Sequence, residues 1–206
     1  MIAGVKQKRK SGRLGRPRAF DPDRALDRAL QVFWRKGFEG ASLTDLTEAM
    51  GINRPSLYAA FGDKEALFRK ALDRYGHGPA AHLRQALKQP TARRVVERLL
   101  GGEADLLTDP RNPRGCLLVQ GALACGEAAD SVRRELIEHR ARFTAAIHER
   151  LKRAKSEGDL PPGANPADLA RFIATVMNGM AVQAAGGATR RQLQRVVQTA
   201  LAAWPQ

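Results

Sequence analysis

A pair of short helices joined by a glycine turn is the feature that most constrains the fold of this chain. Ser42 followed three residues later by Asp45 resembles a capping box, which opens a short helix that Gly51 ends. Asn53 then caps a second short helix. Between the two, Gly51 supplies the left-handed backbone conformation that so tight a turn requires. The segment therefore has the punctuation of a helix-turn-helix unit.

Two further helices flank this pair. Asp21-Pro22 is typical of an N-cap followed by a proline in the first helical turn, and Gly37 closes the amphipathic helix that begins there. After the pair, Gly62-Asp63 stops one helix and caps the next, which we expect over residues 64 to about 75. A longer helix that braces two short ones completes the helix-turn-helix plan.

The second helix of such a pair lies in the major groove of DNA, and we predict it over residues 54–60. Its outward positions are Arg54, Pro55, Ser56 and Ala59. Arg54 is the long donor that can contact a guanine through two hydrogen bonds, whereas Ser56 can reach a base or a phosphate. Ala59 can at most touch a thymine methyl group. Arg54 is therefore the predicted base-reading residue, although a surface arginine at a helix start can also be simply solvated.

Residues 24 to 67 resemble the DNA-binding domain of the TetR family of bacterial transcriptional regulators. The resemblance is carried by the Ala-Leu and Phe of the first helix, the Gly-Phe at its end, Ser-Leu-Thr-Asp-Leu and Gly-Ile. It continues through Ser-Leu-Tyr with a Phe three residues after the Tyr, and Lys-Glu-x-Leu at the start of the fourth helix. These motifs are specific because they occur in order with the right gaps, over roughly a fifth of the chain.

The resemblance implies roles for individual residues. Ser42 and Thr44 would bond phosphates through their hydroxyls and the amides at the start of the second helix. Tyr58 would present its hydroxyl to the DNA backbone, and Lys64 would add a charge-assisted phosphate contact. Where many members place a large polar residue after the tyrosine, this chain has Ala59. Because of that departure, we expect base reading to depend more strongly on Arg54.

Residues 1–18 form a basic N-terminal segment with seven Lys or Arg and no acid. Glycine, serine and proline within it and the lack of apolar periodicity predict a flexible arm. In some members of the resembling family, residues before the first helix enter the adjacent minor groove, which makes Arg16 and Arg18 the candidates here. The alternative is a solvated basic terminus.

The remainder of the chain is rich in Ala and Leu, and no strand pattern occurs anywhere in the sequence. We therefore predict an all-α fold in three parts. These are a flexible basic arm (1–18), a three-helix helix-turn-helix DNA-binding domain (19–66) and a larger helical effector-binding and dimerisation domain (67–206). Within the last part, helices are expected near 91–107, 132–151, 166–185 and 189–204, with a further segment between Cys116 and Cys125.

The helix expected at 166–185 is apolar too widely around its circumference to be a surface helix. In the resembling family the last two long helices pair with their copies in a four-helix dimer interface, which implies a homodimer. A monomeric core is the alternative. The predicted interface residues are Phe172, Val176, Met180, Leu193, Val197 and Leu201.

Members of the resembling family usually enclose a small-molecule pocket in the C-terminal domain, which implies a small-molecule effector for this chain. The candidate lining residues are Leu99, Leu106, Cys116, Leu117, Gln120, Phe143 and Met177.

Cys116 has two opposed interpretations. It follows Arg111 and Arg114 at an expected helix start, where positive charge and amide dipoles would favour a thiolate that reacts with electrophiles or oxidants. The second interpretation, a buried and inert cysteine, is the one that we favour. If Cys116 and Cys125 share one helix, they lie on opposite faces about 13 Å apart, so they cannot form a disulfide with each other.

Composition narrows the class of partner. The chain carries 35 Lys and Arg against 21 Asp and Glu, a net charge of +14, which favours a polyanion, either nucleic acid or an anionic membrane surface. No run approaches the roughly 18 apolar residues of a membrane span, and no signal peptide is recognised, so a cytoplasmic protein without a membrane partner is expected. Two cysteines and four histidines predict no metal site, and no cofactor is expected.

The sequence thus predicts a homodimeric, non-catalytic repressor that leaves a pseudo-palindromic double-stranded DNA operator on a small-molecule or electrophile signal. An activator or an architectural DNA-binding protein is the alternative within the same class. An enzyme that uses Cys116 with His139 or His148 as base is a distant one, because no nucleophile elbow, phosphate loop or metal spacing is present. A membrane-surface protein is disfavoured because the basic segment lacks the apolar face of an interfacial helix.

Overall fold

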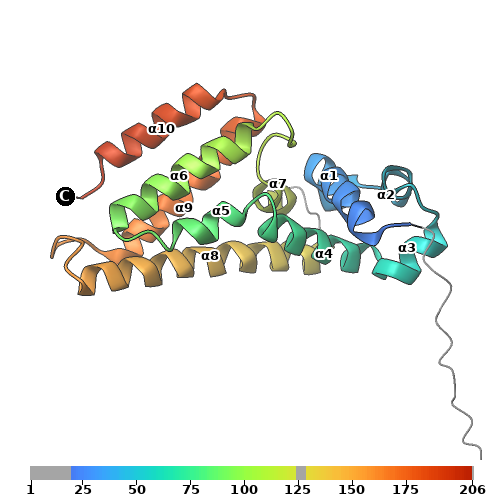
Figure 1. Cartoon of the computed structure of the whole chain (residues 1–206), viewed down its shortest axis with the longest axis horizontal. Coiled ribbons are helices and arrows are strands. Elements are labelled where there is room, and N and C mark those ends of the chain that lie inside the picture. The colour runs from blue at the N-terminus through green and yellow to red at the C-terminus, as the bar shows by residue number, and fades with distance from the viewer. Residues whose placement is uncertain (1–19, 124–128, 206) are drawn as a thin grey trace, which may run out of the picture.

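The computed structural model describes residues 20–123 and 129–205, and these residues form ten α-helices and no strand (Figure 1). The predicted all-α class is therefore confirmed. The helices are α1 (Pro22–Gly40), α2 (Leu43–Met50), α3 (Arg54–Phe61), α4 (Lys64–His77), α5 (Ala81–Ala86), α6 (Ala92–Thr108), α7 (Leu117–Leu123), α8 (Asp130–Ser156), α9 (Pro166–Ala185) and α10 (Arg190–Ala202). Helix α5 escapes sequence-based prediction because it is short and no side chain caps its start.

The predicted caps set the boundaries of α2 and α3. The Ser42 hydroxyl accepts a hydrogen bond from the backbone N–H of Asp45, and the Asp45 carboxylate accepts one from the backbone N–H of Ser42. Gly51 follows α2 with φ at +69°, in the left-handed region that favours glycine. The Asn53 side chain then accepts from the backbone N–H of Ser56. The predicted capping box, turn and N-cap are confirmed.

Helix α1 is interrupted at Gly37, which has φ 70° and ψ −178°. Its regular part therefore ends where the sequence predicts, although helical hydrogen bonding resumes as far as Gly40. Beyond the interruption, the ring of Phe38 lies 5.3 Å from that of Phe68 on α4. Phe33 of α1 meets Phe68 edge to face at 5.0 Å. These rings form the core of the reading head, the name used here for α1 to α4.

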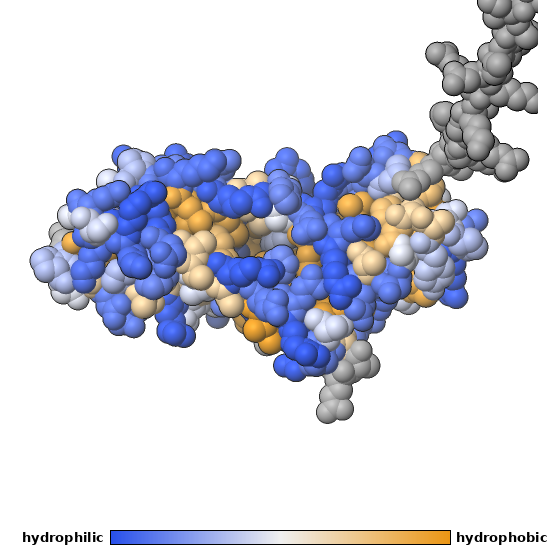
Figure 2. All heavy atoms as spheres, turned by 90° about the horizontal axis from the view of Figure 1, so that it is seen from below, coloured by the Kyte–Doolittle hydropathy of each residue, from blue (hydrophilic) through white to orange (hydrophobic). Residues whose placement is uncertain are grey.

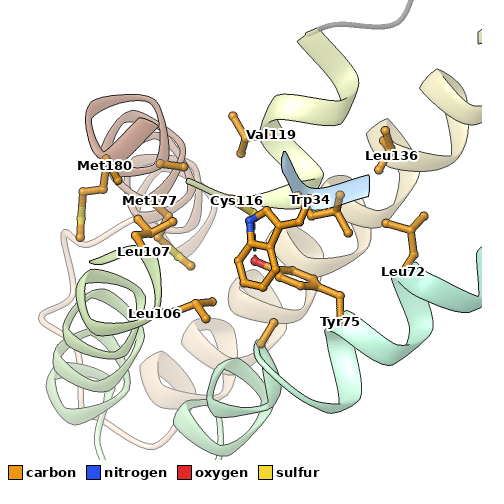
Figure 3. Close-up of a cluster of buried hydrophobic side chains, with 14 of the residues drawn as sticks. Trp34, Leu72, Tyr75, Leu106, Leu107, Cys116, Val119, Leu136, Met177 and Met180 are labelled. Carbon is orange, nitrogen blue, oxygen red and sulfur yellow. Dashed lines mark hydrogen bonds between the residues drawn. The ribbon is translucent and has the colours of Figure 1, made fainter. Parts of the chain in front are cut away.

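Helix α4 connects the reading head to the C-terminal body, which comprises α5 to α10. Trp34 of α1 is buried, and its ring lies 4.8 Å from that of Tyr75 on α4 at an angle of 87°. The indole N–H of Trp34 donates to the carbonyl of Gly115, in the loop before α7, at 2.8 Å. Figure 3 shows these rings beside Cys116. Because α4 runs through residue 66, the two domains predicted at 19–66 and 67–206 share this helix.

The C-terminal body is a layered helical bundle. Figure 1 shows α8 along one side, nearly continuing the line of α4, and α10 on the opposite side, beyond α6 and α9. Leu100, Leu136, Ile147 and Ile173 are among the buried side chains that fill the space between the helices. Hydrophilic residues cover most of the face in Figure 2, and apolar ones gather in patches. Among the described residues, no helix has the length and apolarity that a membrane crossing requires.

Candidate DNA interface and effector cavity

The start of α2 is held by a network of its own polar groups. The Ser42 hydroxyl donates to the Asp45 carboxylate at 2.8 Å, and Lys36 of α1 donates to the same carboxylate at 2.6 Å. The hydrogen bond from Lys36, with those from Ser42, lowers the pKa of Asp45 to about 2. Ser42 is thus engaged within the capping box, and Ser42 and Thr44 are both exposed.

Arg54, at the first position of α3, reaches across the turn to α2. Its Nη2 donates to the Thr44 hydroxyl at 3.2 Å, and the Arg54 side chain is exposed. The sequence assigns these two residues to different parts of the DNA, the guanine edge and the phosphate backbone. The structure brings them into direct contact, so a guanidinium and a hydroxyl are presented together at one surface.

The other predicted DNA-contacting residues of α3 face solvent. Tyr58 is 48% exposed, and Pro55 and Ala59 are also exposed, whereas Ser56 is half-buried. Lys64, at the start of α4, places its ammonium group 4.5 Å above the ring of Phe38. Partial burial lowers the pKa of Lys64 from its ordinary value. The predicted arm residues Arg16 and Arg18 lie outside the described residues.

A cavity of about 210 Å³ lies in the C-terminal body against α4, and it includes three of the predicted lining residues. Cys116, Phe143 and Met177 line it, from the start of α7, from α8 and from α9. Polar side chains that the sequence-based prediction missed join them. These are Asp73, Tyr75 and His77 of α4, Arg84 of α5, Glu103 of α6, His139, Arg140 and Thr144 of α8 and Asn178 of α9.

The other four predicted lining residues do not line this cavity. Leu99, Leu106 and Leu117 are buried by the packing of the body and do not line this cavity, so they offer a ligand no surface there. Gln120 also lies outside the lining, because its side chain folds against Gly115. Apolar periodicity identifies buried faces but does not separate close-packed leucines from those beside a void.

Glu103 is the cavity residue that the sequence could have revealed. It lies one helical turn after Leu99 on α6 and is 4% exposed. Acidic residues are almost never fully buried unless they are paired. An acid on the apolar face of an otherwise amphipathic helix is therefore the signal that sequence analysis overlooked.

Cys116 does not have the reactive environment of the first interpretation. Its thiol is buried, and burial raises the pKa to about 11, with nearby Glu103 adding to the effect. The Tyr75 hydroxyl donates to the sulfur at 3.5 Å. Arg111 pairs with Asp109 instead, and Arg114 donates to a backbone carbonyl at 3.4 Å. The structure therefore favours the buried, inert cysteine over the reactive thiolate, and Cys125 lies outside the described residues.

The predicted dimer face is only partly exposed. Phe172 is 39% exposed and Val176 is half-buried, and Val182 (51%) and Val196 (41%) are exposed large apolar residues on α9 and α10. The other four predicted interface residues are buried by the described residues of the same chain, so they expose little surface of their own. These are Met180, Leu193, Val197 and Leu201. The sides of α9 and α10 that carry these residues face inward, and α6 packs against both helices.

A helix-turn-helix head that shares a helix with a larger helical body containing a cavity is the architecture expected of a DNA-binding regulator. The family model for bacterial regulatory proteins of the tetR family matches residues 25–71, and that for the tetracyclin repressor-like C-terminal domain matches residues 92–200. The chain belongs to the TetR family of bacterial transcriptional regulators.

Individual relatives span nearly the whole chain. The HTH-type transcriptional repressor ComR of Escherichia coli (strain K12) is 32% identical over 194 residues, covering 93% of this chain and 92% of ComR. The HTH-type transcriptional repressor BdcR of the same strain is 31% identical, covering 87% and 86%. A cysteine mutant of the TetR family regulator CifR, complexed with 26-base-pair double-strand operator DNA, is 46% identical with a TM-score of 0.88, covering 92% of this chain and 100% of that one.

Proposed function

We propose that this chain is a homodimeric, sequence-specific transcriptional repressor that leaves its DNA operator when a small molecule occupies the cavity. The observation that carries the proposal is the contact between Arg54 and Thr44 across a fully capped turn. It presents a bidentate donor on a rigid surface, which is what recognition of a guanine in the major groove requires. The solved complex of CifR, which is 46% identical, with operator DNA supports an operator as the partner of this chain.

In this proposal, the DNA contacts divide between affinity and specificity. Residues 19–78 contain nine basic and nine acidic residues, so the reading head has no net charge to draw DNA. The seven basic residues of the 1–18 arm, with Arg16 and Arg18 nearest the head, supply salt-sensitive affinity through the minor groove and phosphates. Arg54 reads bases, with Pro55, Ser56 and Ala59 beside it. Phosphate contacts come from Thr44, Tyr58 and Lys64 and from the amides at Ser42.

A two-fold dimer would place two such heads on successive turns of DNA. Phe172, Val176, Val182 and Val196 give α9 and α10 an exposed apolar surface suited to pairing with a second copy. Half-sites of the operator would then lie about 34 to 36 Å apart, which gives a pseudo-palindrome.

The cavity is the proposed effector site, and the protein is proposed to be cytoplasmic and without catalytic activity. The raised pKa of Cys116 supports the non-catalytic reading, since the thiolate and not the thiol is the nucleophile. A ligand that fits the cavity better in one conformation than in another would shift the separation of the two heads.

Selection of bound sequences from random double-stranded DNA by the full chain tests the proposal. We expect enrichment of one pseudo-palindromic sequence with half-sites one helical turn apart, bound by two copies of the chain. A pool that remains random after repeated selection would overturn sequence-specific repression and favour an architectural role.

A further inference from the structure

The cavity is lined by a buried carboxylate that accepts no hydrogen bond from the described residues. Glu103 is 4% exposed and lines the cavity beside Tyr75 and Cys116. Among the described residues, the one basic group within 4 Å of it is His82, whose Nε2 lies 3.7 Å from Oε2, beyond hydrogen-bond distance. That His82 nitrogen is itself buried and has no hydrogen-bond partner within the described part of the chain.

Burial of a carboxylate in this way lowers the stability of the folded chain unless another group pairs with it. Removing an ionised carboxylate from water without donors opposes folding, so buried carboxylates are usually paired or multiply hydrogen-bonded. Glu103 lines a cavity, so a bound molecule can supply the missing donor. A cationic nitrogen would supply both the donor and the opposite charge.

The apolar side chains of the lining suit the uncharged part of a ligand that carries such a nitrogen. The rings of Tyr75 and Phe143 and the side chains of Met177 and Val119 line the cavity. Figure 3 shows Tyr75, Cys116, Met177 and Val119 converging from α4, from α7 and its preceding loop, and from α9. Aromatic faces attract cations. The cavity volume of about 210 Å³ exceeds the roughly 150 Å³ that accepts benzene in an apolar cavity, so one ring with a short chain fits.

Among the described residues, none of the basic side chains that line the cavity forms an ion pair with this carboxylate, and its one such neighbour, His82, lies outside the lining. Arg84 and His77 are exposed, at the mouth of the cavity. Arg140 donates to the carbonyl of Leu118 at 3.0 Å, and neither arginine forms an ion pair with Glu103. An anionic ligand would have to approach the buried carboxylate, which would repel it, whereas an amine need only pass the solvated charges of the mouth.

We propose that the cavity binds a small, mainly apolar amine in its protonated form, with the ammonium group on Glu103 and the apolar part against Phe143 and Met177. The inference rests on the proposed function in that the cavity is taken as the effector site.

Three probes of similar size test the charge preference on the unaltered chain. Binding of 2-phenylethylamine, 2-phenylethanol and 3-phenylpropionate is measured by titration calorimetry at neutral pH. We expect the amine to bind, the alcohol to bind about tenfold more weakly or less, and the carboxylate not to bind. Equal binding of amine and alcohol, preferential binding of the carboxylate, or no binding of the amine would each overturn the inference.

Two matched variants then assign the preference to one residue. Glu103→Gln keeps the shape of the side chain and should weaken binding of the amine about tenfold or more. Glu138→Gln makes the same chemical change at an exposed residue of α8 outside the lining of the cavity and should leave that affinity unchanged. Equal losses in the two variants, or none in Glu103→Gln, would contradict the role of Glu103. Thermal unfolding of each variant checks that it is folded, and the three-probe comparison needs no variant.

Operator binding without any probe separates this inference from the proposed function. If the chain fails to select an operator but prefers the amine through Glu103, the repressor proposal fails and the ligand inference stands. If it binds an operator but shows no preference for the amine, the ligand inference alone fails.

Discussion

In the reading head, the polar side chains that surround the turn are hydrogen-bonded to one another at the surface, whereas the cavity is lined by a buried carboxylate that accepts no hydrogen bond from the described residues. Arg54 bonds Thr44, and Lys36 and Ser42 bond Asp45. Among the described residues, the one basic group within 4 Å of Glu103 is His82, at 3.7 Å. The head is thus preorganised to bind a rigid, repetitive partner such as DNA. In the cavity, by contrast, a small ligand can supply the hydrogen-bond donor that the described residues do not give to Glu103.

The largest expected effect concerns the link between the two regions. Trp34→Ala should lower the free energy of unfolding by about 3 to 5 kcal/mol, because it empties the buried contact with Tyr75 and leaves the Gly115 carbonyl without its donor. Urea denaturation measures the change. Trp34→Phe, which keeps most of the packing, should cost less. A loss below about 1 kcal/mol for Trp34→Ala would show that head and body are not joined there.

Alkylation of Cys116 tests the cavity side of the comparison. At pH 8 the rate of iodoacetamide labelling should be about a hundredfold below that of an ordinary thiol, since burial raises the pKa from 9.0 to about 11 and only the thiolate reacts. Peptide mass spectrometry measures labelling at this residue, and the urea-unfolded chain provides the control. Similar rates in folded and unfolded chains would restore the electrophile-sensing interpretation.

Arg54→Ala tests the head. Affinity for the selected operator should fall about tenfold to a hundredfold, because one bidentate base contact is lost, while affinity for competitor DNA should change little. Arg191→Ala, an exposed arginine of α10, is the matched control. Fluorescence anisotropy with both DNAs measures the ratio. A uniform loss on both DNAs would make Arg54 a phosphate contact.

The smallest expected effect is the pH dependence of the capping box. The pKa of Asp45 is lowered from 3.8 to about 2, so its stabilising contribution is present above pH 4 and is lost as the pH falls through 2. The melting temperature of the parent chain should therefore fall more steeply between pH 4 and pH 2 than that of Asp45→Asn. Parallel curves for the two proteins would show that the network contributes nothing.

The head could be predicted closely from sequence because its boundaries are local. Asp21, Ser42, Asn53 and Asp63 each cap the helix that follows them, and the left-handed turn needs Gly51. These interactions span two or three residues, so a linear pattern contains them. What the sequence did not show was that Arg54 and Thr44, ten residues apart, meet across the turn.

The cavity and the dimer face depend instead on how distant helices pack. Leu99 and Phe143 are both apolar residues on amphipathic helices, yet only Phe143 lines the cavity. Likewise, Val196 is exposed and Val197 is buried, although both belong to the apolar pattern of α10. A periodic pattern shows which side of a helix is apolar. It does not show which neighbouring helix, cavity or second copy that side meets, because the tertiary arrangement determines that.

The central claim, that this chain is a sequence-specific regulator, is tested most directly by the ratio of its affinities for the selected operator and for random DNA of equal length at physiological salt. We expect the full chain to bind the operator at least about a thousandfold more tightly. Equal affinities for the two DNAs would contradict the account, since the basic residues of the chain would then be binding DNA without reading it.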